Sequence, residues 1–236
     1  MRFIFSVIVV FMSCNVYAQE FFGICKIDTL DTNGAITYIE KILEKNPENL
    51  ECMITLASLY LKKGKLEAGF EYVSRAYKFN ALATQKSSLA PIVRFALNME
   101  ELRKKAYKNN TVEDWNKLGD AYFEFGAYDM AADFFQTSFS KDATQEQIGL
   151  KLAQSYKKIA KTHEAIIVLK QVLQYNPNNF YANYFIGKIL KYSSFDATDF
   201  QIYLKKAEEL LEKDKKLISN PEYPKFINDI LYELGS

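Results

Sequence analysis

Hydrophobic positions in the middle of the chain follow the spacing of an α-helix and are interrupted by a glycine. Four positions at i, i+3, i+4 and i+7 share one helix face: Trp115, Leu118, Gly119 and Tyr122. After Gly126 the helical spacing returns at Ala131, Phe135 and Ser138. Two helices pack closely when small residues on one lie opposite large residues on the other. The pattern therefore predicts two antiparallel helices with a turn at Gly126, and Gly119 and Ala131 where they approach.

The pattern returns at a period of 34 residues. One step downstream keeps the size class at Leu152, Ala153, Tyr156, Ala160, Ala165, Leu169 and Val172. A further step gives Ile186, Gly187 and Leu190. Upstream, the same classes lie at Leu56, Ala57, Tyr60, Gly64, Gly69, Val73 and Ala76. Self-similarity at such a period is typical of a repeat array, so the sequence predicts an all-α chain of stacked helix pairs.

These residues resemble the tetratricopeptide repeat. The motif reads Trp-x-x-Leu-Gly-x-x-Tyr from Trp115, followed by Gly, Ala and Phe, with a proline such as Pro177 closing a unit. The resemblance covers about residues 35–83 and 112–212. It implies a right-handed superhelical solenoid of antiparallel helix pairs, with the first helix of each pair on the concave face.

We expect one repeat domain over residues 19–236. Its predicted parts are a partial repeat at 19–49, repeats at 50–83, 112–145, 146–179 and 180–213, a degenerate repeat at 84–111, and a capping helix within 214–236. We interpret 84–111 as one shortened hairpin, and a short insertion is expected near "SSFD" in the last repeat. The capping helix should start near Pro224 and turn four residues inward: Phe226, Ile230, Leu231 and Leu234.

The N-terminus resembles a signal peptide. Arg2 precedes an apolar run of about ten residues, and Val16 and Ala18 suit cleavage after residue 18. A buried helix or a membrane anchor is the alternative. "FMSC" also resembles a poor lipobox, which makes Cys14 a candidate for lipidation. In an exported chain Cys25 and Cys52 either pair or remain as two buried thiols.

The resemblance places a ligand groove on the first helices. The selected groove residues are Ile54, Leu61, Asn116, Asp120, Phe123, Leu150, Gln154, Lys158, Tyr181, Tyr184 and Lys188. The expected groove changes from acidic near Asp120 to basic near Lys158 and Lys188, which would orient a bound segment. In the alternative interpretation, Tyr181 and Tyr184 pack against the C-terminal helix and the lysines form a solvated face. The Lys/Asn pairs by which some tetratricopeptide domains clamp a chaperone's C-terminal carboxylate do not occur at the matching positions.

Composition and chemistry limit the function classes. The chain is 49% hydrophobic and 25% charged with a net charge of +1, and no basic stripe indicates a nucleic-acid partner. His163 is the one histidine, and no nucleophile, phosphate-binding or zinc motif accompanies it. We therefore expect no enzyme activity, cofactor or metal.

Three hypotheses about function remain. The first is an exported adaptor or assembly scaffold of the cell envelope that binds a protein or peptide in the groove. The second is a lipid-anchored structural subunit of an outer-membrane assembly or export complex, since membrane contact is expected only through a lipid on Cys14. The third is a chain that forms homo-oligomers through its incomplete N-terminal helix pair.

Overall fold

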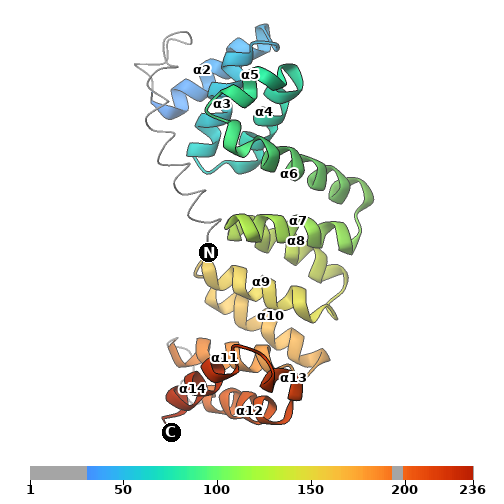
Figure 1. The fold of residues 1–236 in the computed structure, drawn as a ribbon, viewed down its shortest axis with the longest axis vertical. Coiled ribbons are helices and arrows are strands. Elements are labelled where there is room, and N and C mark those ends of the chain that lie inside the picture. The colour runs from blue at the N-terminus through green and yellow to red at the C-terminus, as the bar shows by residue number, and fades with distance from the viewer. Residues whose placement is uncertain (1–30, 193–198, 236) are drawn as a thin grey trace. The chain divides into compact units, whose positions relative to one another are not determined.

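The computed structural model describes residues 31–192 and 199–235, which are helical with no strand among them (Figure 1). The predicted signal peptide, Cys14, Cys25 and the insertion near "SSFD" lie outside the described residues. The helices are α2 (Thr32–Lys45), α3 (Leu50–Lys62), α4 (Leu66–Phe79), α5 (Ala81–Lys86), α6 (Ala90–Asn109), α7 (Val112–Phe125), α8 (Tyr128–Lys141), α9 (Glu146–Lys158), α10 (Thr162–Tyr175), α11 (Phe180–Tyr192), α12 (Phe200–Lys213), α13 (Lys215–Ile218) and α14 (Tyr223–Leu234).

The chain divides into two compact units, Met1–Lys108 and Asn109–Ser236. In the first unit, α3 and α4 form a hairpin and α2 packs on α3. Ile39 and Leu43 of α2, one helical turn apart on one face, are buried, whereas Ile42 is half-buried.

Residues 84–111 differ from a hairpin of two equal helices. They contain the end of α5 and the whole of α6, a single helix of 20 residues. Pro91 lies in the first turn of α6, where a missing backbone N–H is tolerated. No glycine or proline follows until the helix ends, so nothing in the sequence interrupts it.

Glu100 links α6 to α4 in the first unit. Its carboxylate accepts hydrogen bonds from Lys78 of α4 at 2.7 Å and from Lys104 at 2.5 Å. Burial alone would raise the pKa of Glu100, but the bonds from the two lysines outweigh it and lower the pKa to about 2.

The second unit contains the hairpins α7–α8, α9–α10 and α11–α12, which follow one another in Figure 1. α7 ends at Gly126, which has a left-handed φ of 88° and returns the chain for α8. A Cβ at Gly119 would lie 2.6 Å from ring carbons of Phe135, and both Ala131 and Phe135 are fully buried. The predicted small-against-large packing of this hairpin is therefore confirmed.

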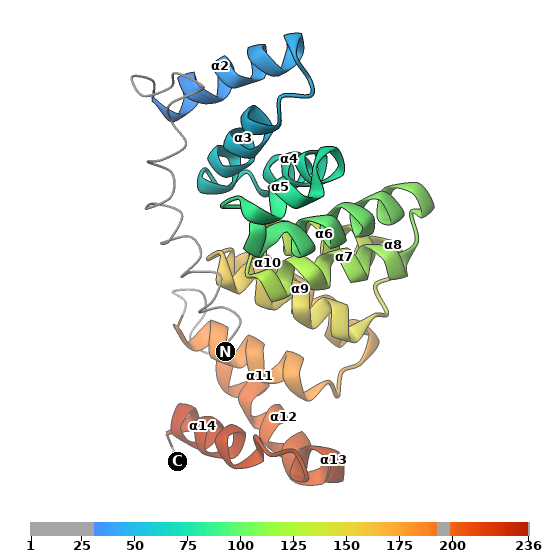
Figure 2. The ribbon, with the colours of Figure 1, turned by 45° about the horizontal axis from the view of Figure 1, so that its top comes forward.

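The second unit ends with α12, α13 and α14, and Figure 2 shows α13 and α14 beyond α12. Leu204 and Ala207 of α12 are fully buried. They form one cluster with Phe180 and Tyr184 of α11 and with Phe226 and Ile230 of α14.

Candidate protein-binding face

The first helices of the second unit carry polar side chains that join each helix to the next. Asn116 of α7 donates to Gln145, just before α9, at 2.7 Å. Lys151 of α9 forms an ion pair with Asp120 of α7 at 2.6 Å, and both side chains remain more than one third exposed. The pairing supports the stacking of α7 and α9 and leaves polar atoms accessible along it.

The eleven residues selected from the sequence differ in accessibility. Ile54 and Leu61 lie in the first unit and the other nine in the second. Four are buried and belong to the packed core: Ile54, Leu61, Leu150 and Tyr184. Six are half-buried: Asn116, Asp120, Phe123, Gln154, Tyr181 and Lys188. Lys158 is exposed.

The burial of four selected residues has a physical reason. Apolar side chains at these positions of a first helix fill the space beside a neighbouring helix. Leu61 illustrates this, because a Cβ at Gly69 of α4 would lie 2.6 Å from the Leu61 side chain. Phe123 is partly engaged in the same way, with ring centroids 5.3 Å from Tyr128 and 6.2 Å from Phe135.

The end of α9 and the facing part of α11 are basic. Desolvation of the ammonium, followed by the charges of Lys188 and Lys158, lowers the pKa of Lys157. Lys158 lies over the Tyr128 ring at 5.7 Å from its centroid. The basic part of the predicted charge change is thus a group of lysines close enough to interact electrostatically.

At α11, the aromatic side chains contact the C-terminal helix. The Phe226 ring of α14 lies edge-on to three aromatic rings, with centroids 5.3 Å from Phe180, 5.9 Å from Tyr181 and 5.4 Å from Tyr184. Tyr181 also accepts a hydrogen bond from Asn220, before α14. The alternative interpretation of Tyr181 and Tyr184, packing against the C-terminal helix, describes where the structure places them.

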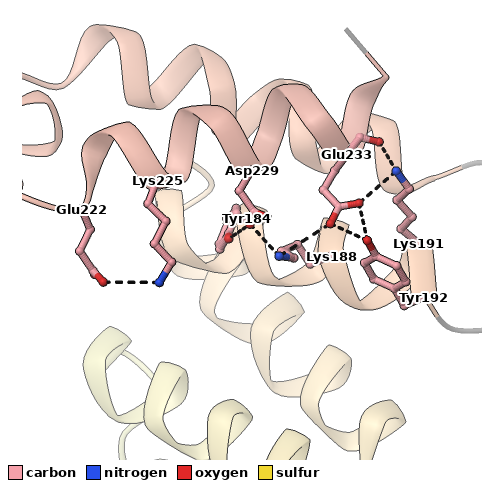
Figure 3. Close-up of polar contacts among 8 residues, drawn as sticks. All are labelled: Tyr184, Lys188, Lys191, Tyr192, Glu222, Lys225, Asp229 and Glu233. Atoms are coloured by element: carbon pink, nitrogen blue, oxygen red, sulfur yellow. Dashed lines mark hydrogen bonds and ion pairs between the residues drawn. The ribbon is translucent and has the colours of Figure 1, made fainter. Parts of the chain in front are cut away.

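Two acidic residues of α14 meet four polar residues of α11 (Figure 3). Asp229 accepts hydrogen bonds from the Tyr184 hydroxyl and, at 2.6 Å, from Lys188. Glu233 accepts from the Tyr192 hydroxyl at 2.7 Å and pairs with Lys191 at 3.0 Å. Lys188 also lies 3.7 Å from Glu233, so one lysine links both carboxylates.

These contacts shift the pKa of each acid and each phenol. Burial would raise the pKa of both carboxyls, but the bonds from Lys188 and Tyr184 to Asp229, and from Tyr192 and Lys191 to Glu233, lower it. The hydrogen bond to Glu233 raises the pKa of Tyr192 to about 12. Burial and the bond to Asp229 raise the pKa of Tyr184. Both acids are therefore ionised at neutral pH.

Sequence reasoning missed Asp229 and Glu233. It expected Leu231 and Leu234 on the inner face. Leu234 packs against the buried cluster, but Leu231 is half-buried and Glu233 is only 3% exposed. The signal was present, because Phe226, Ile230 and Glu233 are spaced i, i+4 and i+7 and so share one helix face. A carboxylate on that face indicates cationic partners on the helix beneath it.

The described residues show few features of a metal-binding, catalytic or membrane-spanning site. They contain no group of three or more His, Cys, Asp or Glu side chains that could hold a metal ion. His163 is exposed in the first turn of α10. Within the described part of the chain, no helix is long and apolar enough to cross a membrane.

Comparison with known proteins agrees with the repeat pattern. Residues 148–179, which cover most of the α9–α10 hairpin, match the family model of the tetratricopeptide repeat. A TPR repeat-containing protein of Methanocaldococcus jannaschii is 27% identical over 137 residues, or 58% of this chain and 23% of the relative. The chain thus spans less than a quarter of that relative's length. Both matches support the tetratricopeptide resemblance seen in the sequence.

Solved structures with similar helix arrangements have low sequence identity. The crystal structure of MamA is 21% identical, with a TM-score of 0.43, over 79% of this chain and 92% of that chain. The C-terminal part of a TPR repeat-containing protein from Cytophaga hutchinsonii is 14% identical, with a TM-score of 0.48, over 85% of this chain and 81% of that chain.

Proposed function

We propose that this chain is a non-enzymatic interaction module that binds a protein or peptide on the first helices of its second unit. Tetratricopeptide repeats bind such partners, and no enzyme family is indicated for this chain. The supporting observation is the row of accessible polar side chains along α7 and α9, which are not buried in the packing between helices. It runs from Asp120, whose side chain stays more than one third exposed, to Gln154 and Lys158.

The proposed partner segment is oriented by charge. Asp120 marks the acidic part of this face, and Lys157 and Lys158 mark the basic part. Complementary charges on a partner raise its association rate and fix its direction of binding. We therefore propose that the bound segment carries acidic residues where it meets the end of α9.

We further propose that the chain acts as an adaptor or assembly scaffold in the cell envelope. The supporting feature is the signal-peptide pattern of residues 1–18. A second candidate, a lipid-anchored subunit of an outer-membrane assembly or export complex, is favoured by Cys14 in "FMSC". The mass of the mature chain distinguishes the two candidates, because a start at Gln19 without lipid excludes the anchor.

Crosslinking capture from an envelope extract tests the binding face. The bait Lys157→Gln with Lys158→Gln should recover the partner at least about tenfold less well than the wild-type chain. The matched control is Lys161→Gln with Lys170→Gln. It removes the same charge from two exposed positions of the same repeat, the residue just before α10 and one within α10. Equal recovery by both variants would exclude this face of α9 as the binding site.

A further inference from the structure

We infer that the face of α11 beneath α14 is a binding site for an acidic amphipathic helix of a partner protein. In this structure α14, the chain's own helix, occupies the site as a tethered competitor. The inference rests on the proposed function only in taking the partner to be a protein. It concerns another helix, and its test uses different variants.

The position of α14 is that of the first helix of one more repeat. Its buried residues Phe226, Ile230 and Glu233 have the spacing of Ala182, Ile186 and Ile189, which lie 44 residues earlier on α11 and are also buried. α14 packs on α12 as α11 packs on α10. The site is therefore shaped to receive a helix that continues the repeat stack.

The connection to α14 is longer than those between repeats. Residues 176–179 separate α10 from α11, and residues 142–145 separate α8 from α9. The segment before α14 comprises residues 214–222 and includes the short α13. A longer tether lowers the effective concentration of the helix that it carries, which makes displacement by a second helix easier.

Charge, rather than apolar burial alone, holds α14 on α11. Ile189, the residue of α11 equivalent to Glu233, is apolar. A buried ion pair often adds no more stability than apolar residues of similar volume, because removing charges from water costs several kcal/mol. A helix that served only as a permanent cap would not need Glu233. We assign its carboxylate to recognition of Lys191 and Tyr192.

The sign of the charge distinguishes this site from the equivalent site on α7. Asp120 and Lys188 occupy the same position on α7 and α11, 68 residues apart. Asp120 of α7 pairs with Lys151 of α9, whereas Lys188 of α11 pairs with Asp229 of α14. An acidic helix is therefore attracted to α11 and repelled by α7, which selects both the partner and its position.

The contacts define the partner's pattern. Phe226 supplies an aromatic ring among the rings of Phe180 and Tyr184. Asp229 and Glu233 follow it at i+3 and i+7 and accept bonds from the cations and hydroxyls of α11. We therefore expect a partner helix with an aromatic residue at i and carboxylates at i+3 and i+7.

A labelled peptide of residues 222–235 serves as the probe, and fluorescence anisotropy measures its binding to the full chain. The variant Asp229→Asn with Glu233→Gln weakens the tethered helix. It should bind the peptide at least about tenfold more tightly than the wild-type chain, whose own α14 competes at a high effective concentration. A peptide carrying the same two substitutions should bind this variant at least about tenfold more weakly than the unaltered peptide does.

Adding Lys188→Gln and Lys191→Gln to the chain with Asp229→Asn and Glu233→Gln tests the contribution of α11. It should abolish this tight binding, whereas Lys161→Gln with Lys170→Gln should leave it intact. Equal binding with and without Lys188 and Lys191 would overturn the inference. So would absence of binding to a weakened chain that circular dichroism shows to be folded.

Hydrogen exchange provides a measurement that needs no variant. In the wild-type chain, the amides of α14 should exchange faster than those of α12, and faster still when an excess of the peptide of residues 222–235 displaces α14 from α11. Exchange of α14 as slow as α12 would mean that α14 does not detach, and would overturn the inference. A dimer that exchanges α14 between two copies would also overturn it, in favour of a second copy as occupant.

Discussion

At the scale of single residues, the turns of the α3–α4, α7–α8 and α9–α10 hairpins require a left-handed backbone. Gly64 and Gly126 adopt it with φ of 75° and 88°, and Ala160, at the equivalent position of the next repeat, adopts it with φ of 60°. An alanine in this region is strained by about 1–2 kcal/mol, because its Cβ approaches a carbonyl oxygen. The sequence kept a small residue at position 160 but not the glycine that suits the turn.

Ala160→Gly should therefore stabilise the second unit by about 0.5–1 kcal/mol, the strain relief being partly offset by the greater freedom of glycine in the unfolded chain. Urea unfolding followed by Trp115 fluorescence measures the change, since this tryptophan is in the same unit. Ala121→Gly within α7 is the control and should destabilise by about 1 kcal/mol. A loss of stability at position 160 as large as at 121 would contradict the argument.

At the scale of helices, the sequence predicts hairpins well where small and large residues alternate at a fixed period. The turn at Gly126 and the contact of Gly119 with Phe135 follow from that alternation. It predicts less where a position is defined by a distant element. Tyr184 is buried because α14 covers it, and α14 begins at Tyr223, 39 residues later in the sequence. The same holds for the lysines of α11, whose acidic partners are on α14.

The attachment of α14 should depend on pH in two opposite directions. The pKa values of Asp229 and Glu233 are lowered in the folded chain, so their contribution is complete above the ordinary carboxyl pKa of about 4 and is lost as pH falls below it. The pKa values of Tyr184 and Tyr192 are raised, so their contribution is complete below about 10 and is lost as pH rises above it.

Thermal unfolding of the wild-type chain and of Asp229→Asn with Glu233→Gln, compared across pH, tests this dependence. The wild-type chain should be more stable by about 1–3 kcal/mol near neutral pH, the usual effect of charged hydrogen bonds. The difference should close toward low pH, where the carboxyls of the wild-type chain are protonated. A difference that stays constant from neutral pH to pH values well below the ordinary carboxyl pKa would show that the charges do not hold α14.

At the scale of the whole chain, the division into residues 1–108 and 109–236 predicts two unfolding transitions. A compact unit with its own core unfolds as a cooperative element, and different probes then report different transitions. Trp115 is the sole tryptophan and lies in the second unit, whereas helices in both units contribute to circular dichroism. Fluorescence and circular dichroism should therefore give urea curves that do not coincide.

A core substitution in each unit makes this prediction specific. Leu56→Ala in the first unit and Leu152→Ala in the second both remove a fully buried leucine side chain, which costs about 2–5 kcal/mol. Leu152→Ala should move the Trp115 fluorescence transition to lower urea, whereas Leu56→Ala should leave it in place and shift only part of the circular dichroism curve. If Leu56→Ala moves the fluorescence transition by the same amount, the chain unfolds as one cooperative array, and repeat-to-repeat coupling extends across residue 108.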